Sequence, residues 1–120
     1  MIDEKTVEKI EGYLQDMVQA HQAFTSRGSK VYEAELGIVS EAARDGAIDK
    51  MHKELVAIGI SMVVNCEPCQ VYHINQALKS GASAEQIVEV MQIAIEMGGG
   101  PVMARSNFAW KVLEYFQDKA

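Results

Sequence analysis

Apolar residues in the first part of the chain recur at alternating steps of three and four positions. This stripe consists of Val7, Ile10, Leu14, Met17, His21 and Phe24. Such spacing predicts an amphipathic helix whose apolar face is buried. His21 lies on the stripe, and we interpret it as a core or interface histidine rather than a ligand, because no second metal-type residue accompanies it.

The same helical spacing recurs in the segments that follow, and strong turn signals separate them. A loosely patterned helix, interrupted by a glycine, is predicted over about residues 30–45. Asp49 predicts the N-cap of a helix that runs to about Val64 and is apolar almost all round, so we expect it to be central. Asn65 is expected to end this helix and to cap another that begins at Cys66.

The second half of the chain also predicts helices with recognisable starts. Pro68 is tolerated because residues in a first turn have no intrahelical partner for their N–H. Ser83 predicts the N-cap of a helix that Gly98–Gly100 end, and Pro101 suits the first turn of the last helix. The sequence therefore predicts one all-α domain over residues 1–120, with about six helices and a central antiparallel helix pair.

Two of the predicted helices carry more apolar surface than a small domain can cover. Residues 54–64 and 87–97 are apolar in several directions. A chain of 120 residues has a limited interior. Because association of several copies would bury this surplus, we expect a homo-oligomer.

Charge and composition exclude several classes of partner. The formal net charge is −6, and Lys and Arg form no run, so we expect binding to neither nucleic acid nor membranes. The N-terminus lacks a basic and apolar leader pattern, and no apolar run is long enough to span a bilayer. These features predict a cytoplasmic protein, in which a close cysteine pair is more often reactive or metal-binding than structural.

The motif that carries chemistry is Cys66-x-x-Cys69 with His73 four residues after the second cysteine. On a helix these positions share one face, so both sulfurs and the imidazole converge. The N-terminus of a helix favours the thiolate form of a cysteine, and a nearby imidazole can accept the thiol proton. Redox chemistry is the favoured interpretation, with metal binding and inert burial as alternatives.

Glu54 is the candidate partner of this group. It is the only acidic residue between Lys53 and Asn65. If the chain reverses near Asn65 into an antiparallel helical hairpin, Glu54 lies level with His73 or Ile74. Pairing with His73 would then satisfy a buried carboxylate and orient the ring. The alternative is that Glu54 points to solvent from the first turn of its helix.

The Cys66-x-x-Cys69-x-x-x-His73 motif, with Glu54 twelve residues before its first cysteine, continues into the segments at 77–83 and 98–101. In these features the chain resembles the AhpD-like superfamily, which includes alkyl hydroperoxidase D and the carboxymuconolactone decarboxylase family. The resemblance implies an all-α fold that forms trimers or hexamers. It also implies peroxidase or disulfide-reductase activity that uses no cofactor beyond the redox-active cysteine pair.

The resemblance further implies a role for each site residue. Cys69 would be the attacking cysteine and Cys66 its resolving partner, with Glu54 and His73 in a proton relay. The hydroperoxidase branch often has a second relay histidine where this chain has Pro68, so we expect weak peroxidase activity. The substrate would be a hydroperoxide or a disulfide, and the reductant an external dithiol such as a thioredoxin-like or lipoyl protein.

Three other functions are alternatives. The chain can act as a thiol-disulfide oxidoreductase or electron carrier that does not reduce peroxide. A decarboxylase is a weaker alternative because the decarboxylase branch generally lacks the cysteine pair. A metal-binding module would take its ligands from the two cysteines, His73 and Glu54, although three ligands on one helix face fit a tetrahedral shell awkwardly.

Overall fold

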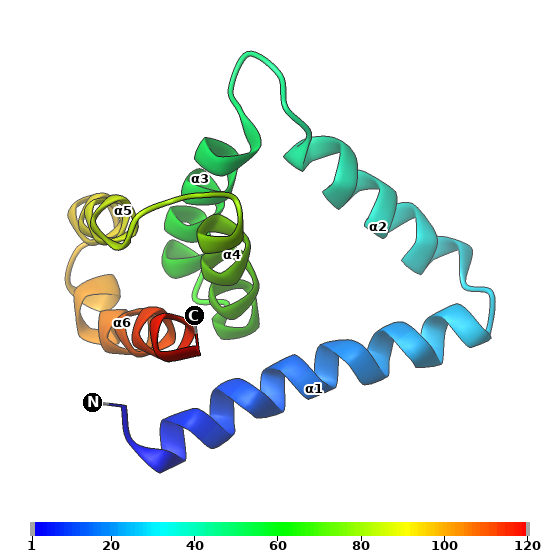
Figure 1. The fold of residues 1–120 in the computed structure, drawn as a ribbon, viewed down its shortest axis with the longest axis horizontal. Coiled ribbons are helices and arrows are strands. Elements are labelled where there is room, and N and C mark those ends of the chain that lie inside the picture. The colour runs from blue at the N-terminus through cyan, green and yellow to red at the C-terminus, as the bar shows by residue number, and fades with distance from the viewer. Residues whose placement is uncertain (1, 120) are drawn as a thin grey trace.

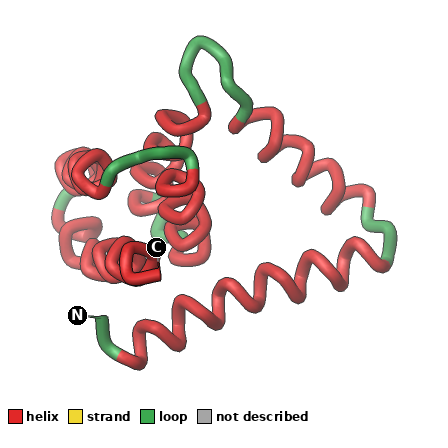
Figure 2. The backbone as a smooth tube through the Cα atoms, in the orientation of Figure 1, coloured by secondary structure: helices red, strands yellow, loops and turns green. Residues whose placement is uncertain are grey.

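The computed structural model describes residues 2–119, which form six α-helices and, within that range, no strand (Figure 1). Short loops join the helices (Figure 2). The all-α prediction is therefore confirmed. The helices are α1 (Glu4–Ser26), α2 (Lys30–Ala43), α3 (Lys50–Val63), α4 (Glu67–Lys79), α5 (Ala84–Gly98) and α6 (Gly100–Lys119). None of the helices described here is both long and apolar enough to cross a membrane.

Two helices begin at the caps that the sequence predicts. The Asp49 carboxylate accepts the His52 N–H at 2.9 Å, and the Ser83 hydroxyl accepts the Gln86 N–H at 3.1 Å. The Gln86 side chain returns a bond to the Ser83 N–H, which completes a capping box. Pro101 lies in the first turn of α6, as predicted.

The core lies between α3, α4, α5 and α6. The antiparallel pair α3 and α4 packs most extensively, and α5 and α6 cover it (Figure 1). Each of these helices contributes a side chain with no exposed area, namely Ile58, Ile74, Ile87 and Val112. The central helix pair is therefore confirmed, and this is the scaffold that fixes the start of α4.

The turn between α3 and α4 differs from the prediction in one respect. Asn65 does not cap α4, because its backbone is left-handed with φ 59° and closes α3. The Asn65 N–H donates to the Met62 carbonyl, and the Cys66 N–H donates to the Ser61 carbonyl at 3.0 Å. This pair of bonds is a Schellman motif. Cys66 is left with extended backbone as the N-cap, so α4 begins at Glu67.

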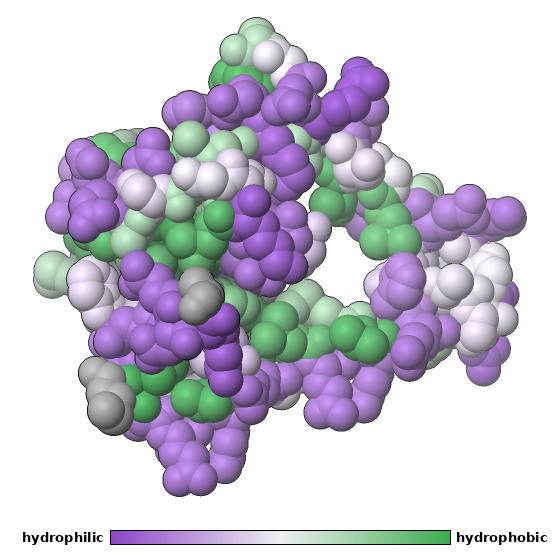
Figure 3. Space-filling model, in the orientation of Figure 1, coloured by the Kyte–Doolittle hydropathy of each residue, from purple (hydrophilic) through white to green (hydrophobic). Residues whose placement is uncertain are grey.

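The C-terminal half of α1 and helix α2 form an arm, and the space-filling view is hollowed between this arm and the other four helices (Figure 3). Of the predicted stripe on α1, only Ile10 is fully buried. Val7, Leu14 and Met17 pack partly against the core. Helix α2 buries no side chain.

The far end of α1 packs only against α2. The rings of Phe24 and Tyr32 stack with their centroids 5.3 Å apart, and the His21 ring lies 5.8 Å from Tyr32. His21 is exposed. The interpretation of His21 as a core residue is therefore wrong for the single chain, because α1 extends beyond the core at that point; an interface role stays a prediction.

Candidate active site

The start of α4 holds both cysteines. Cys66 and Cys69 form a disulfide, and both residues are half-buried. The Cys69 N–H points back at the Cys66 sulfur, at 3.2 Å, as a backbone donor does at an N-cap. A sulfur at this position lies where the unpaired N–H groups and the dipole of α4 favour negative charge.

Glu54 and His73 meet across the interface between α3 and α4. The Nδ1 atom of His73 lies 2.6 Å from Oε1 of Glu54. Glu54 is only 3% exposed. The predicted pairing is therefore confirmed, and the solvent-facing alternative for Glu54 is wrong. His73 also lies one helical turn beyond Cys69 on α4, as the spacing requires.

Lys50 completes the environment of the buried carboxylate. Its Nζ lies 3.0 Å from Oε2 of Glu54 and donates to Oε1 of Gln76 at 3.3 Å. The sequence analysis missed Lys50 and Gln76. A signal for Lys50 exists, because it precedes Glu54 by four residues and therefore lies on the same face of α3.

This arrangement fixes the proton on the neutral His73 ring. An ionised carboxylate only accepts hydrogen bonds, so Nδ1 of His73 must carry the hydrogen that bonds to Glu54. The other ring nitrogen, Nε2, is then the atom that can take up or release a proton. Glu54 thus orients the ring through one carboxylate oxygen, and Lys50 forms an ion pair with the other.

A second polar cluster lies beside Cys66. The Tyr13 hydroxyl donates to Oε1 of Glu67 at 2.7 Å, and Lys9 forms an ion pair with the same oxygen at 2.9 Å. The hydrogen bond to Glu67, followed by burial, raises the pKa of Tyr13 to about 12. Partial burial acts to raise the pKa of Glu67, but the bonds from Lys9 and Tyr13 outweigh it and the pKa is lowered.

Arg105 reaches the same place from α6. Its Nη2 donates to the carbonyls of Met62 at 3.2 Å and Val63 at 3.5 Å, in the last turn of α3. Tyr13, Glu67 and Arg105 were all missed from the sequence, and no local pattern could have revealed them. They lie on three helices that only the tertiary fold brings together.

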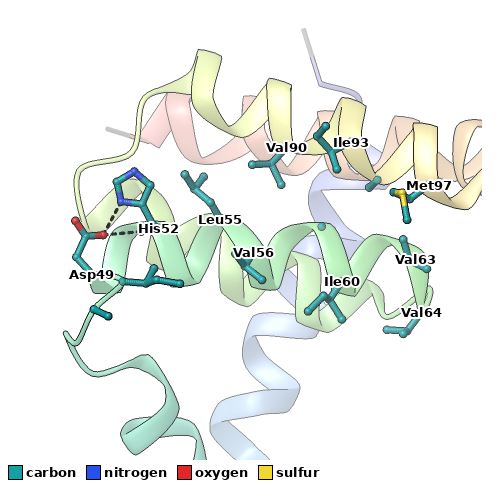
Figure 4. A pocket seen from close by; sticks show the side chains of 14 residues that line it. Asp49, His52, Leu55, Val56, Ile60, Val63, Val64, Val90, Ile93 and Met97 are labelled. Carbon is teal, nitrogen blue, oxygen red and sulfur yellow. Dashed lines mark hydrogen bonds and ion pairs between the residues drawn. The ribbon is translucent and has the colours of Figure 1, made fainter.

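An apolar groove lies elsewhere, between α3 and α5, with a volume of about 1070 Å³ (Figure 4). Val56, Ile60, Ile93 and Met97 lie along it, and the His52–Asp49 pair marks one end. None of the cysteines, Glu54 or His73 lines this groove. The groove is therefore separate from the cysteine pair and from the Glu54–His73 pair.

The four residues that the sequence offered as possible metal ligands are paired with one another. The two sulfurs are joined, and His73 is bonded to Glu54. Within residues 2–119, no group of three or more His, Cys, Asp or Glu side chains is arranged to hold a metal ion.

Curated proteins are similar to about two thirds of this chain. An uncharacterised protein of Cupriavidus necator is 40% identical over 80 residues, which cover 67% of this chain and 68% of that protein. An alkyl hydroperoxide reductase AhpD of Corynebacterium kroppenstedtii is 28% identical over 80 residues. The match covers 67% of this chain but only 46% of that reductase.

Solved structures share the fold. A carboxymuconolactone decarboxylase family protein of Legionella pneumophila superposes with a TM-score of 0.85 at 27% identity, over 91% of this chain and 97% of that one. The sequence pattern of the same family matches residues 30–112, which include α3 and α4 with both cysteines, Glu54 and His73. The chain thus belongs to the carboxymuconolactone decarboxylase family, within the AhpD-like superfamily.

Proposed function

We propose that the protein is a thiol-dependent peroxidase of the alkyl hydroperoxide reductase type. The observation that carries the proposal is the imidazole of His73, oriented by buried Glu54 and placed one turn from a cysteine pair at a helix N-terminus. A nucleophile beside an oriented base is the arrangement that thiol chemistry requires. The similarity to an alkyl hydroperoxide reductase supports the choice of peroxide as oxidant.

In the proposed reaction, the Cys69 thiolate attacks the terminal oxygen of a hydroperoxide and the O–O bond breaks. The leaving alkoxide takes a proton, and Cys69 becomes a sulfenic acid. The Cys66 thiolate then attacks the Cys69 sulfur and releases water, which forms the disulfide. His73 exchanges the required protons through Nε2 while Glu54 holds Nδ1. An external dithiol, from a thioredoxin-like or lipoyl protein, returns two electrons.

Two serine variants test this reaction. Cys69→Ser removes the attacking sulfur and should abolish peroxide consumption. Cys66→Ser should reduce one peroxide per chain and then stop as the sulfenic acid, which dimedone labels. Stopped-flow measurement of peroxide loss distinguishes the two outcomes. Multiple turnovers by both variants would contradict the assigned roles.

A second candidate function is disulfide reduction or electron transfer without peroxide chemistry. It is favoured by Pro68, which occupies the place where the hydroperoxidase branch often carries a second relay histidine. This function is supported if reduced wild-type protein exchanges rapidly with a disulfide but consumes organic hydroperoxide no faster than a free thiol does. Pro68→His is the matching gain-of-function variant.

We also propose that the protein forms a homo-oligomer, a trimer or hexamer, through its apolar groove. Val56, Ile60, Ile93 and Met97 are 56%, 57%, 62% and 73% exposed in the single chain. Such a contiguous apolar surface is typical of an interface. Light scattering should show that Ile60→Lys lowers the molar mass, whereas Glu85→Lys, on the polar edge of α5, leaves it unchanged.

A further inference from the structure

The two sulfurs of the disulfide face different surroundings. A pocket of about 690 Å³ opens beside the start of α4. Cys66 lines this pocket and Cys69 does not. The remaining lining residues come from α1, from the turn before α4, from α4 and from α6, and they are Tyr13, Asn65, Glu67, Pro68 and Arg105.

Cys69 precedes a different neighbour on α4. His73 follows it by one turn of α4, and Glu54 holds the His73 ring from α3. A thiolate that leaves from Cys69 can therefore receive a proton from Nε2 of His73. In disulfide exchange, the sulfur that leaves fastest is the one whose thiolate is most stable.

The charge of the pocket comes chiefly from Arg105. Its guanidinium bonds to two backbone carbonyls, and its Nε atom is buried without a hydrogen-bond partner among the described residues. No carboxylate of residues 2–119 forms an ion pair with Arg105. The negative charge of Glu67 is offset by the positive charge of Lys9, which forms an ion pair with it at 2.9 Å. The pocket therefore has a net positive charge that faces Cys66.

We propose that an external thiol reduces the disulfide by entering this pocket and attacking the Cys66 sulfur, and that the pocket favours thiols that carry an anionic group. The proposal rests on the thiol-redox function proposed above and names the entry point and the chemical class of its reductant. Oxidant and reductant then meet different sulfurs: peroxide reacts at Cys69, and electrons enter at Cys66.

The step balances as an ordinary thiol-disulfide exchange. The reductant thiolate forms a bond to the Cys66 sulfur as the bond between the two cysteines breaks, and Cys69 leaves as a thiolate. A second thiolate, from the same dithiol or from another molecule, then attacks the reductant's sulfur and releases Cys66. Two electrons pass from the reductant, which becomes a disulfide, to the protein, which becomes a dithiol.

The first experiment identifies the attacked sulfur in the wild-type protein. Oxidised protein is mixed rapidly with 3-mercaptopropionate, quenched with acid and treated with N-ethylmaleimide. Fragment ions between the two cysteines then show which sulfur carries each label. We expect mercaptopropionate on Cys66 and maleimide on Cys69. The reverse assignment would overturn this inference and leave the redox function intact, whereas a disulfide that no thiol reduces would overturn both.

The second experiment tests the charge of the pocket. Rates of disulfide reduction by 3-mercaptopropionate, 2-mercaptoethanol and cysteamine are each divided by the rate of the same thiol with a small reference disulfide. We expect the corrected rate to fall from the anionic to the neutral to the cationic thiol, by about threefold per charge, as unit charges about 6 Å apart give in water-like surroundings. High salt should reduce the differences.

Variants of Arg105 separate charge from packing. Arg105→Met should remove most of the preference for the anionic thiol, and Arg105→Lys should keep it. Arg44→Met, which removes an exposed arginine at the end of α2, is the matched control and should behave as wild type. An unchanged preference in folded Arg105→Met would overturn the role of Arg105. If that variant fails to fold, the wild-type protein still tests the role of Arg105. Equal corrected rates for the anionic, neutral and cationic thiols, with no dependence on salt, would overturn it.

Discussion

The buried carboxylate of Glu54 is the position where a small chemical change should have the largest effect on stability. Glu54→Gln keeps the size and shape of the side chain and can still accept a hydrogen bond from Nδ1 of His73. That bond loses its charge assistance, which lowers its contribution by about 1 kcal/mol. Lys50 loses its counter-ion, but its side chain is 39% exposed and partly solvated, so this adds about 1 kcal/mol more.

We therefore expect Glu54→Gln to lower the free energy of unfolding by about 2 kcal/mol. Glu54→Ala should cost about 3–5 kcal/mol, because it leaves the partner groups unpaired and opens a cavity. Urea unfolding followed by circular dichroism measures both, and a slope of about 2 kcal/mol per molar converts the first loss into a midpoint about 1 M lower. Protein concentration must be constant, since the proposed association would contribute to stability.

Glu85→Gln supplies the control for this series. Glu85 is an exposed residue in the first turn of α5, and its neutralisation should change stability by no more than about 0.5 kcal/mol. Equal losses in Glu54→Gln and Glu85→Gln would refute the reasoning, because they would mean that Glu54 is hydrated and holds neither His73 nor Lys50.

Two further predictions concern other parts of the fold. Gly98→Ala places a methyl group against the Val102 side chain, with the two Cβ atoms 3.0 Å apart, and should destabilise by about 1–3 kcal/mol. Gly37→Ala, in an exposed helical turn with nothing within 4 Å, should stabilise by roughly 0.5–1 kcal/mol. Thermal unfolding measures both variants, and a Gly98→Ala protein more stable than Gly37→Ala would contradict the packing at the junction of α5 and α6. Tyr13→Phe should cost about 1 kcal/mol near neutral pH, where the hydroxyl bonds to Glu67. Because the pKa of Tyr13 is raised to about 12 from about 10, this contribution is complete below about pH 10 and is lost as the pH rises towards 12. Urea unfolding of both proteins across that range should show the difference disappear, and a constant difference would contradict it.

The parts of the site that the sequence predicts are those held together by local geometry. Glu54 and His73 are 19 residues apart on one helical hairpin, so equal distances from the turn place them level. The error at Asn65 has a similar local origin. Asparagine suits both an N-cap and a left-handed helix end, and the second use prevails here because it satisfies two carbonyls of α3.

The pocket beside Cys66 could not be predicted in this way. Tyr13 contacts Glu67 across 54 residues, and Arg105 contacts Met62 across 43. Neither contact follows from helical periodicity, because each depends on how α1 and α6 cross the central pair. The apolar stripe of α1 shows the same limit: periodicity predicts which residues share a face but not how far along the helix a neighbour extends.

The exposure of helix α2 offers a way to measure association of the protein by hydrogen exchange. A helix of 14 residues with no buried side chain should exchange its amide hydrogens almost as fast as a peptide, because isolated helices of this length are marginal in water. Its outward side chains include Val31 and Ile38, at 82% and 60% exposure. Contact with another subunit would cover such residues and slow the exchange. In an oligomer whose second subunit packs on α2, the amide protection of α2, measured against that of α4 in the same sample, becomes an internal gauge of association. This protection responds to dilution while the cysteine pair stays within a folded helix.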